Sequence, residues 1–458
     1  MDLTKYTKTE LLAKCATLGI TKCKSKTKPE LIQLIQANYV SEPVSEPAFD
    51  SSETIISELV LSSIKYKFID LFCGIGGFHQ ALTVKGCECV FAADIDPHCR
   101  AIYERNYGLK PAGDITQVDE NAIPAFDILC GGFPCQPFSK SGFQKGFEDT
   151  RGTLFFDICR IAKHHQPKYM ILENVKNLTS HDDGKTWKVI YNAIIELGYQ
   201  TYVEPVVLNV LHYNVPQNRE RVVIMCKRAD LGLLPPLPEI QKHPKLTLTV
   251  GIKDIICDEN TPILNEYTLS GKMSDVNTVW NNFIQLLKQH QIQIPKYPIW
   301  TDWWDNDINE DSAFYEKYTG WIDKNRAFYQ THYTVLNPWL QQSRQCANWT
   351  GAVRKFEWQA GELLHDDSMS TIIWTARGSG IRVKRPNYIP TLVAMNMIPV
   401  YGPKRRKLIP RELLRLQSFP DNFVYDEKHI FKQVGNAVNV KMMEYVYQFL
   451  VEGKSLFP

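Results

Sequence analysis

Short apolar runs alternate with amphipathic stretches along the middle of the chain. Five runs are expected to form buried strands, at 68–72, 89–93, 127–130, 169–172 and 221–226. Between them, apolar residues recur at helical spacing, as in Leu154 to His164 and Trp187 to Leu197. Strands and helices that alternate in this way favour a doubly wound α/β sheet with helices on both faces.

A glycine-rich turn follows the first predicted strand. Gly74, Gly76 and Gly77 come directly after this strand, and Asp94 ends the next one. Glycine leaves the strand-to-helix turn open to a ligand, and an acidic residue at the tip of the next strand suits a ribose diol. A dinucleotide-dependent oxidoreductase is the main competing interpretation. It is disfavoured because the pattern is not Gly-x-Gly-x-x-Gly and because hydride transfer gives no role to the cysteine described next.

Cys135 lies between two prolines, Pro134 and Pro137, just after the predicted strand at 127–130. Each proline fixes one φ angle, so the loop has few ways to relax. Glu173 ends another apolar run, and loops beyond strand ends are where open α/β sheets place their ligands. The pattern predicts a thiol nucleophile assisted by a carboxyl group. A buried cysteine that acts only as a small hydrophobic residue is the simpler alternative.

Six motifs occur in an order that resembles the DNA cytosine-5 methyltransferases of bacterial restriction–modification systems. They are Phe68 to Phe78, Gly113-Asp114-Ile115, Gly131 to Ser139, Glu173-Asn174-Val175, Gln217 to Arg221 and Gln433 to Val438. With their connecting segments they cover roughly residues 65–230 and 375–455. Any one of them is a weak signal, but six in this order are hard to obtain by chance.

The resemblance implies a discontinuous, Rossmann-like methyltransferase domain that depends on S-adenosyl-L-methionine. This domain would comprise residues 65–235 and 386–458, with a smaller target-recognition domain at 236–385. The implied reaction is methyl transfer to carbon 5 of a cytosine flipped out of duplex DNA. Ser139 to Arg151 would form the mobile loop that closes behind the flipped base.

The resemblance also assigns catalytic roles. Cys135 would add to carbon 6 of the ring, which makes carbon 5 nucleophilic. Glu173 would bind and protonate N3, and Arg221 would hold the carbonyl oxygen of the base. Arg219 would contact the cysteine loop or a phosphate, and Gln136 is grouped with these residues. An ordinary surface pair is the alternative for the two arginines.

Contacts to the methyl donor follow from the same resemblance. Phe72 would stack near the adenine, Asp94 would hold the ribose, and Asp114 with Ile115 would flank the adenine amino group. The remaining expected donor contacts are Gly74, Ile75, Gly77, Ile95, Pro134 and Asn436. Pro134 and Asn436 would lie nearest the transferred methyl group.

Two of these donor positions depart from the family pattern. Asp94 is one methylene shorter than the glutamate that is common at this position, and Ile95 replaces a frequent aromatic residue. Both changes are expected to weaken donor affinity without altering the geometry of methyl transfer.

Charge is unevenly distributed although the net charge is only +2. Residues 376–411 hold nine Lys or Arg and no acidic residue, whereas Trp300 to Asp323 carries seven acidic residues and one lysine. This asymmetry predicts a basic face on DNA phosphates with the acidic surface turned away, and a solvated charge run is the alternative. Lys404 to Lys407 would also fit a nuclear-import patch, but phosphate contact is favoured.

The segment between the arginine motif and the basic block is rich in tryptophan. Nine of the ten tryptophans lie from Trp280 to Trp374, and most are expected to fill a small core. The resemblance makes this segment the reader of base edges in the major groove. Its candidate readers are Arg354, Lys355, Gln359 and Arg377. The recognised DNA sequence does not follow from one amino-acid sequence.

The first 39 residues form a separate pattern with seven lysines and three acidic residues. Thr7-x-x-Glu10 and Thr27-x-x-Glu30 are capping boxes before apolar residues, so two short helices are expected. This segment resembles the SAP-type helix–extension–helix module, which binds duplex DNA with little sequence preference. A helical hairpin used for protein contact is the alternative. Residues 40–64, which include Ser-Glu-Pro-Val-Ser-Glu-Pro, are expected to be a flexible linker.

The remaining expectations concern the setting of the enzyme. Twelve cysteines without a Cys-x-x-Cys pair indicate neither a zinc site nor disulfides. Without a signal peptide or an apolar run of membrane length, an intracellular protein is expected, acting as a monomer on duplex DNA. The function is expected to be protection of DNA from a cognate restriction endonuclease, with a viral or host modification enzyme as the alternative; the sequence does not distinguish the two.

Two other functions remain possible from the sequence. A transfer-RNA cytosine methyltransferase is one alternative, but that class carries a Cys-Phe-Thr tripeptide in the insert, which this chain lacks. A DNA-binding regulator without catalysis is the other, and the intact Cys135, Glu173 and Arg221 speak against it.

Overall fold

The computed structural model describes residues 7–9, 11–12, 23, 26–39, 64–134, 154–240, 249–258, 260–263, 265–305, 312–395 and 397–458. The chain divides into two compact units, residues 1–63 and 64–458. In the first unit, helix α2 (Lys28–Tyr39) begins after Thr27, whose main-chain N–H donates to Glu30 Oε2 at 2.7 Å. A small apolar cluster holds this unit together and comprises Leu11, Cys23, Leu31 and Ile35.

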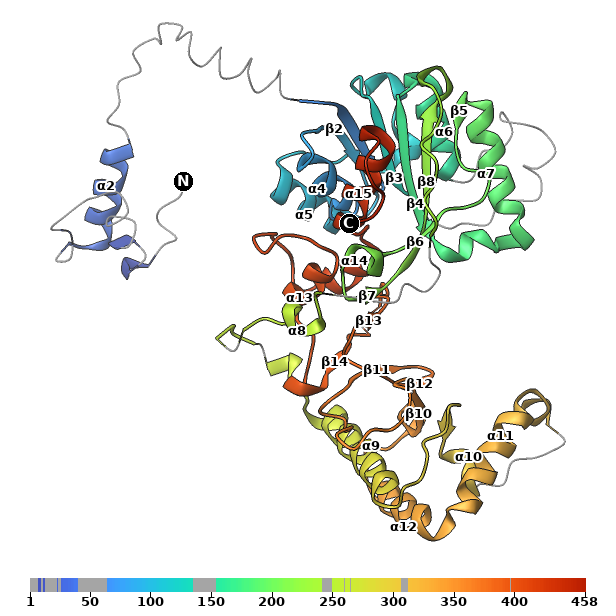
Figure 1. The fold of residues 1–458 in the computed structure, drawn as a ribbon. Coiled ribbons are helices and arrows are strands. Elements are labelled where there is room, and N and C mark those ends of the chain that lie inside the picture. The colour runs from blue at the N-terminus through green and yellow to red at the C-terminus, as the bar shows by residue number, and fades with distance from the viewer. Residues whose placement is uncertain are drawn as a thin grey trace, which may run out of the picture. The chain divides into compact units, whose positions relative to one another are not determined.

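The second unit contains a central sheet with the strand order β2-β1-β3-β4-β8-β5, in which β6 also pairs with β8 (Figure 1). Its strands are β1 (Lys67–Leu71), β2 (Glu88–Ala93), β3 (Ile128–Gly132), β4 (Tyr169–Val175), β5 (Tyr199–Gln200), β6 (Val207–Asn209) and β8 (Glu220–Arg228). Strands β1 to β4 pair in parallel, whereas β8 is antiparallel to β4. The carboxyl ends of four neighbouring parallel strands therefore meet at one edge of the sheet.

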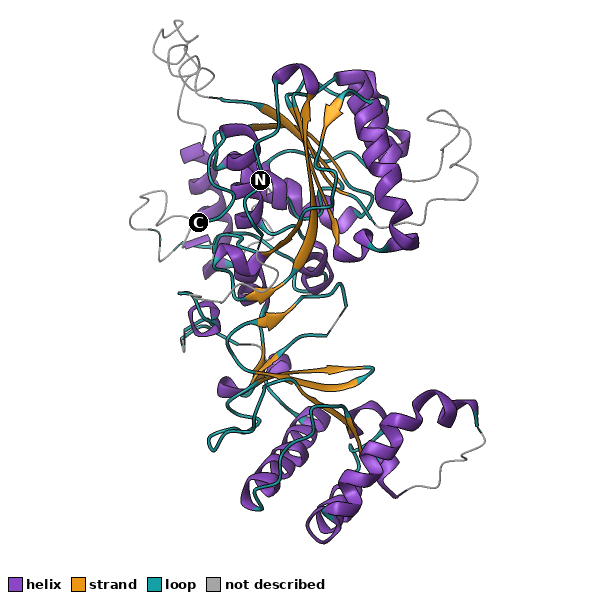
Figure 2. Ribbon diagram, turned by 45° about the vertical axis from the view of Figure 1, so that its right-hand side comes forward, coloured by secondary structure: helices purple, strands orange, loops and turns teal. Residues whose placement is uncertain are grey.

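Helices cover both faces of this sheet (Figure 2). Successive side chains of a strand point to opposite faces, and in β4 Ile171 enters one apolar cluster while Met170 and Leu172 enter the other. The first cluster includes α4 (Gly77–Thr83) and α15 (Val440–Glu452), and the second includes α6 (Leu154–His165) and α7 (Lys185–Glu196). This arrangement confirms the predicted doubly wound α/β sheet.

The C-terminal helices complete the domain that the first strands of the second unit begin. Helices α13 (Pro410–Leu416), α14 (Ile430–Asn436) and α15 contribute to the cluster that also holds Phe68 and Phe78. At Gly77 an added Cβ would lie 2.4 Å from the carbonyl oxygen of Val438, so only glycine allows the two motifs to approach this closely. Helix α5 (Pro97–Tyr107) follows β2.

A second lobe has its own core and its own sheet, with the order β15-β14-β11-β12-β10-β9. These strands are β9 (Ile299–Trp300), β10 (Lys355–Trp358), β11 (Ile373–Arg377), β12 (Gly380–Lys384), β14 (Val400–Tyr401) and β15 (Arg406–Lys407). The helices of this part are α9 (Gly271–Gln289), α10 (Asp302–Asp305), α11 (Ala313–Thr331) and α12 (Tyr333–Arg344), whereas α8 (Ile252–Ile255) packs into the core of the catalytic domain. Trp280, Trp304, Trp349 and Trp374 are fully buried, so these four fill the core as expected.

The two ends of the segment that carries the second lobe lie side by side. Strand β7 (Gln217–Asn218) pairs in parallel with β13 (Ile389–Pro390), and Gln217 lies opposite Ile389. Thr391 Oγ1 also donates to the carbonyl oxygen of Asn218 at 2.7 Å. Segments on either side of the second lobe thus meet in one small sheet, next to β8 of the catalytic sheet, which follows β7 directly.

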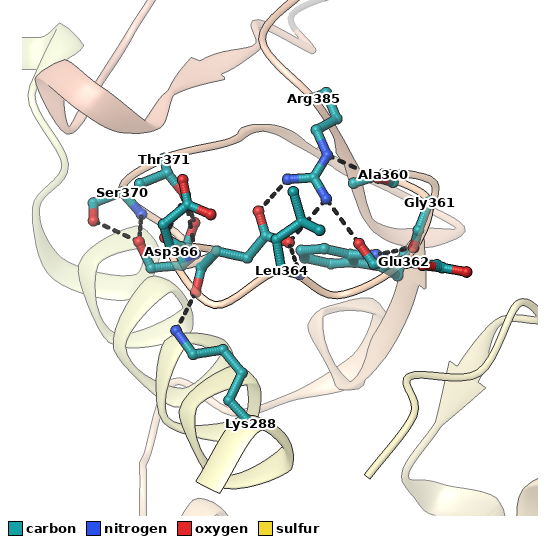
Figure 3. Close-up of polar contacts among 12 residues, drawn as sticks. Lys288, Ala360, Gly361, Glu362, Leu364, Asp366, Ser370, Thr371 and Arg385 are labelled. Carbon is teal, nitrogen blue, oxygen red and sulfur yellow. Dashed lines mark hydrogen bonds and ion pairs between the residues drawn. The ribbon is translucent and has the colours of Figure 1, made fainter. Parts of the chain in front are cut away.

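The loop between β10 and β11 is held by Arg385, which follows β12 (Figure 3). Arg385 donates to the carbonyl oxygens of Ala360 and Glu362 and pairs with Asp367, whose side chain is buried. Lys288 of α9 donates to the main-chain carbonyl of Asp367 at 2.8 Å. These bonds fix the loop to both neighbouring elements.

Part of the basic block at 376–411 therefore stabilises the fold and is not available to phosphates. Besides Arg385, the buried Arg406 makes two hydrogen bonds to Glu412, at 2.9 and 2.6 Å. Arg411 donates to the carbonyl oxygens of Pro420 and Phe423. The expectation of one continuous phosphate-binding block is wrong for these three arginines.

Two further findings bear on the expected setting. Among the helices that the structure describes, none combines the length and the apolar composition needed to cross a membrane. Within the same described residues, no three His, Cys, Asp or Glu side chains are grouped as metal ligands.

Candidate active site

A cavity of about 600 Å³ opens where β1, β2, β3 and β4 end. Residues at or just after the ends of these strands line it, together with Arg219 and Arg221. Further lining comes from distant segments, including 113–115, 391–394, 432–433 and 435–438. Distant parts of the chain thus form one site.

Most of the predicted site residues line this cavity. They are Phe72, Gly74, Asp94, Ile95, Asp114, Ile115, Pro134, Glu173, Arg219, Arg221 and Asn436. Cys135 and Gln136 lie outside the described residues, and Pro134, which directly precedes Cys135, belongs to the lining.

Two predicted donor contacts do not line the cavity. Ile75 is buried in the apolar cluster beneath the turn, and Gly77 lies against Val438. These two residues support the glycine turn from the side of the core. The sequence had led us to expect that they contact the methyl donor directly.

The turn after β1 has an unusual backbone at Phe72. Its φ is +56°, a left-handed conformation that a bulky side chain rarely adopts. Gly76 has a φ of +86°, and an added Cβ there would lie 2.2 Å from the ring of Tyr107. Strain of this kind is retained where the surrounding structure over-determines it, often at ligand sites. Here it places an aromatic residue on the cavity wall.

Asp94 connects the tip of β2 to the glycine turn. Its Oδ2 accepts a hydrogen bond from Gly74 N–H and its Oδ1 accepts one from Asp96 N–H, both at 2.8 Å. Burial raises the pKa of the Asp94 carboxyl, and these two hydrogen bonds oppose the shift. Each carboxylate oxygen has two lone pairs, so the group can still accept bonds from a ligand.

The third segment of the wall is set by Asp114. Its Oδ1 accepts bonds from Thr116 N–H at 3.0 Å and from Thr116 Oγ1 at 2.9 Å, which caps the short 3-10 helix Ile115–Gln117. Ile115 is buried beside it. The cap therefore fixes an apolar side chain and an acidic one at the edge of the cavity.

Glu173 and Arg221 form a close ion pair in the cavity wall. Glu173 Oε1 lies 2.7 Å from Arg221 Nε, although this oxygen has no hydrogen-bond partner of suitable geometry. Both side chains are at most 10% exposed. Burial raises the pKa of Glu173, and the two arginines Arg221 and Arg219 oppose that shift. A carboxyl with a raised pKa can hold a proton nearer to neutral pH.

Arg219 is fully buried and is bound to the main chain. It donates to the carbonyl oxygens of Leu392 at 3.1 Å, Gly435 at 3.2 Å and Ala437 at 2.8 Å. Burial, with repulsion from Arg221, lowers the pKa of Arg219 to about 9. Its guanidinium group therefore positions the cavity wall and is not exposed to a phosphate, contrary to one of the two expected roles.

Among the described residues, two cysteines line the cavity, Cys73 and Cys99. Burial raises the pKa of Cys99 to about 12 and the pKa of Cys73 well above its usual value. The thiolate is the nucleophilic form of cysteine. Neither of these thiols is therefore suited to compete with a cysteine that is activated in a polar site.

Gln433 lines the cavity and was not singled out by the sequence. The side chain is 4% exposed, and neither its amide nitrogen nor its amide oxygen has a hydrogen-bond partner. Buried polar groups are nearly always paired. Its place in the motif Gln433 to Val438 was the available signal.

Other missed residues come from tertiary contacts. Lys432 of α14 pairs with Asp96 at 3.1 Å, and both line the cavity. Residues 391–394 lie in no recognisable motif, so the sequence held no signal for them.

The four candidate base readers of the second lobe have different surroundings. Arg354 pairs with Asp302 at 3.0 Å, and Lys355 Nζ lies 3.2 Å from the ring centroid of Trp300. Gln359 donates to Glu357. Arg377 differs, because its Nε is buried without a hydrogen-bond partner.

The sheet and its cavity place the chain among the Rossmann-like methyltransferases. The family of C-5 cytosine-specific DNA methylases matches residues 66–452. The chain belongs to this family and is a sequence-specific DNA cytosine-5 methyltransferase, as its motifs predicted.

Two named type II methyltransferases agree with this assignment. Type II methyltransferase M.HhaI of Haemophilus parahaemolyticus is 35% identical over 382 residues, which cover 83% of this chain and 92% of that protein. Type II methyltransferase M.HpaII of Haemophilus parainfluenzae is 32% identical over 393 residues, or 83% of this chain and 87% of that protein. The solved structure of the S. pombe Dnmt2 methyltransferase is 16% identical, with a TM-score of 0.45 over 85% of this chain and 99% of that one.

Proposed function

We propose that this enzyme takes its methyl group from S-adenosyl-L-methionine and passes it to a flipped-out cytosine that is bound covalently to Cys135. One observation carries the proposal. A single cavity is lined both by the expected donor residues, such as Phe72 and Asp94, and by the expected cytosine residues Glu173 and Arg221. A donor and a base bound there would be neighbours.

The residues of the cavity fit this donor. A volume of about 600 Å³ is typical of a site for a small-molecule cofactor. The carboxylate of Asp94 can accept from ribose hydroxyls, and the unpartnered amide of Gln433 offers a donor and an acceptor. When bound, S-adenosyl-L-methionine supplies an activated methyl group on a sulfonium.

The chemistry at the base rests on three residues of this chain. The Cys135 thiolate adds to carbon 6 while Glu173 delivers a proton to N3, so the ring becomes an enamine with a nucleophilic carbon 5. Once carbon 5 is methylated, N3 returns its proton to Glu173, a water molecule takes the proton from carbon 5, and the bond between carbon 6 and sulfur breaks, which releases the thiolate and restores the aromatic ring. The raised pKa of Glu173 suits the delivery of a proton at N3.

Arg221 has a double task in this proposal. It holds the carbonyl oxygen of the base and also balances the Glu173 carboxylate, to which it lies 2.7 Å away. Arg219 has no contact with the base in this proposal. It fixes residues 392, 435 and 437, and so keeps Asn436 on the cavity wall.

Transfer of a radiolabelled methyl group to duplex DNA and to transfer RNA tests the substrate. We expect labelling of duplex DNA alone. Labelling of transfer RNA would favour the related RNA enzymes, and labelling of neither would favour a silent DNA-binding regulator. Bisulfite sequencing of DNA from cells that express the chain would then give the recognised sequence.

The covalent step has its own test. Cys135→Ser should abolish methylation and leave donor binding near normal. A duplex that contains 5-fluorocytosine should trap an adduct with the wild-type protein and none with Cys135→Ser. Substantial turnover by the serine variant would contradict covalent catalysis.

The domain roles and the biological setting are part of the same proposal. Residues 236–385 would read the target sequence and residues 1–39 would hold duplex DNA with little sequence preference. The enzyme would act inside the cell as a monomer on DNA. Because M.HhaI and M.HpaII are named type II methyltransferases, we infer a companion endonuclease with the same target, and plasmids methylated in cells should resist it.

A further inference from the structure

The sheet of the second lobe has one apolar face and one polar face. Side chains of β10, β11 and β12 that point to the apolar face enter the core of the lobe, namely Phe356, Trp358, Trp374, Ile381 and Val383. The strand register places Glu357 opposite Arg382, and Arg382 opposite Thr375. Side chains alternate along a strand, so Arg377, Arg382, Lys384 and Glu357 share the other face. We call these four residues the cationic face.

Charge is not balanced on the cationic face. Arg382 Nε donates to Glu357 Oε2 at 2.9 Å, which satisfies one of the three cations. Within the described part of the chain, no ion pair is formed by Arg377 or Lys384, and the buried Nε of Arg377 has no hydrogen-bond partner. Lys384 Nζ has only a weak contact, 5.6 Å from the ring centroid of Tyr388. Two half-buried positive charges are left without an anion.

The cations of this face also repel one another. Burial lowers the pKa of Arg377 and that of Lys384, and the charge of Arg382 lowers both further, while Glu357 opposes the shifts. Holding like charges together at half-buried positions costs free energy unless an anion compensates them. A bound anion would remove this cost.

The cationic face is turned toward the catalytic domain. Ile373 lies on the same face, because it is opposite Lys384 in the register, and Tyr401 is opposite Ile373. Ile373 is buried in the apolar cluster of the catalytic domain, and Tyr401 packs against that cluster. The catalytic domain thus covers this side of the sheet at Ile373 and Tyr401. The charged residues of the cationic face lie next to this covered part.

We propose that the cationic face binds the phosphate backbone of the target duplex. The inference deepens the proposed function, because it requires that the second lobe holds DNA. Base edges carry no net charge and would leave the two cations uncompensated, whereas the backbone presents one negative charge at each nucleotide. The face therefore sets the position of the duplex and does not read its sequence.

The salt dependence of DNA binding tests this role. The full chain would be titrated into a labelled duplex at sodium chloride concentrations from about 50 to 200 mM, the range in which phosphate contacts dominate. Arg377→Gln and Lys384→Gln should each reduce the slope of log affinity against log salt by about 0.9, and the double variant should lose about twice that. Unchanged slopes in both single variants would overturn the proposal.

Glu357→Gln gives a prediction of opposite sign. Removal of the only carboxylate of the face should tighten binding several-fold and steepen the salt slope, because a third cation becomes free. If the face were only structural, the loss of the Arg382 partner would weaken binding or leave it unchanged, and either result would contradict the proposal. Lys317→Gln, on the exposed surface of α11 in the same lobe, is the matched control and should leave the slope unchanged.

Methyl transfer separates this proposal from the one on which it rests. At low salt and saturating plasmid DNA, the wild type and the control variant Lys317→Gln should methylate at similar rates, since Lys317 does not line the catalytic cavity. An inactive wild type would contradict the proposed function. An active wild type with unaltered slopes in the variants would contradict only the role of the cationic face.

Discussion

Both terminal nitrogens of Arg219 donate to the carbonyl oxygen of Gly435, each at 3.2 Å. The bonds connect the residue between β7 and β8 to α14, across most of the second half of the sequence. Glu173 and Arg221 lie beside Arg219 in the cavity wall. Arg219 therefore holds the segment around Gly435 next to this charged pair. The packing of the catalytic site therefore depends on a residue that its motif suggested as a direct participant.

Arg219→Lys should destabilise the protein. The single ammonium group of a lysine cannot bond the carbonyl oxygens of Leu392, Gly435 and Ala437 at the same time. Buried carbonyls without a partner cost about 1–3 kcal/mol each. We expect the free energy of unfolding to fall by about 3 kcal/mol, measured by denaturant titration. Arg228→Lys, at the end of β8, is the control and should cost less than about 1 kcal/mol, because its pair with Asp230 is at the surface. Equal effects would contradict the positioning role.

Glu173→Gln should separate donor binding from catalysis. Without a carboxyl to deliver a proton at N3, methylation should fall by at least about 100-fold, whereas the affinity for S-adenosyl-L-methionine should stay within about two-fold of wild type. Turnover and calorimetric titration provide the two measurements. A variant with near-normal turnover would exclude Glu173 as the proton donor.

The raised pKa of Glu173 also predicts a pH dependence of stability. The folded state holds this proton more tightly than the unfolded state, so its contribution to stability is present below the ordinary value of 4.5 and is lost as the pH rises through the folded-state pKa. Glutamine does not titrate. The stability of Glu173→Gln relative to wild type should therefore increase as the pH rises from about 4.5, in denaturant titrations at a series of pH values. A constant difference would show that burial does not shift this group.

Gln433→Leu should raise stability and lower donor affinity together. Among the described residues the buried amide has only a weak partner, the Cys99 thiol, so an apolar side chain of similar volume should stabilise the free enzyme by about 1–2 kcal/mol. If the amide binds the donor, the dissociation constant of S-adenosyl-L-methionine should rise by about ten-fold or more. Thermal unfolding and calorimetric titration would measure both effects. Unchanged donor affinity would remove Gln433 from the donor site.

Two glycine substitutions should act in opposite directions. At Gly435 an added Cβ would lie 2.5 Å from main-chain atoms of Val393 and Ala394, so Gly435→Ala must displace the backbone that forms the cavity wall. We expect a loss of stability of about 2 kcal/mol and weaker donor binding. Gly320, within α11, has open space around it, and Gly320→Ala should stabilise the helix by about 0.5–1 kcal/mol. Denaturant titration of both variants tests the contrast.

Local patterns were sufficient to predict the central sheet. The runs at 68–72 and 169–172 correspond to β1 (Lys67–Leu71) and β4 (Tyr169–Val175), since short apolar runs between turn residues form buried parallel strands. The helix predicted from Leu154 to His164 is α6, which ends one residue later. These features depend on residues that are close in the sequence.

The parts that the sequence did not reveal depend on contacts between distant residues. The role of Arg219 follows from carbonyl groups at 392, 435 and 437, which no local pattern relates to it. In the same way, the nine cations of the basic block look equivalent in the sequence. Only the tertiary structure shows that Arg406 is bound to Glu412, whereas Arg377 has no partner among the described residues.

The pairing of β7 with β13 limits where this chain can be recombined. Gln217 and Ile389 are neighbours in space, but β8, which carries Arg221, lies between them in the sequence and belongs to the catalytic sheet. A foreign segment joined at these two residues would therefore have to bring its own β8 and its own arginine. An exchange that keeps the chemistry intact has to begin beyond the end of β8 at Arg228.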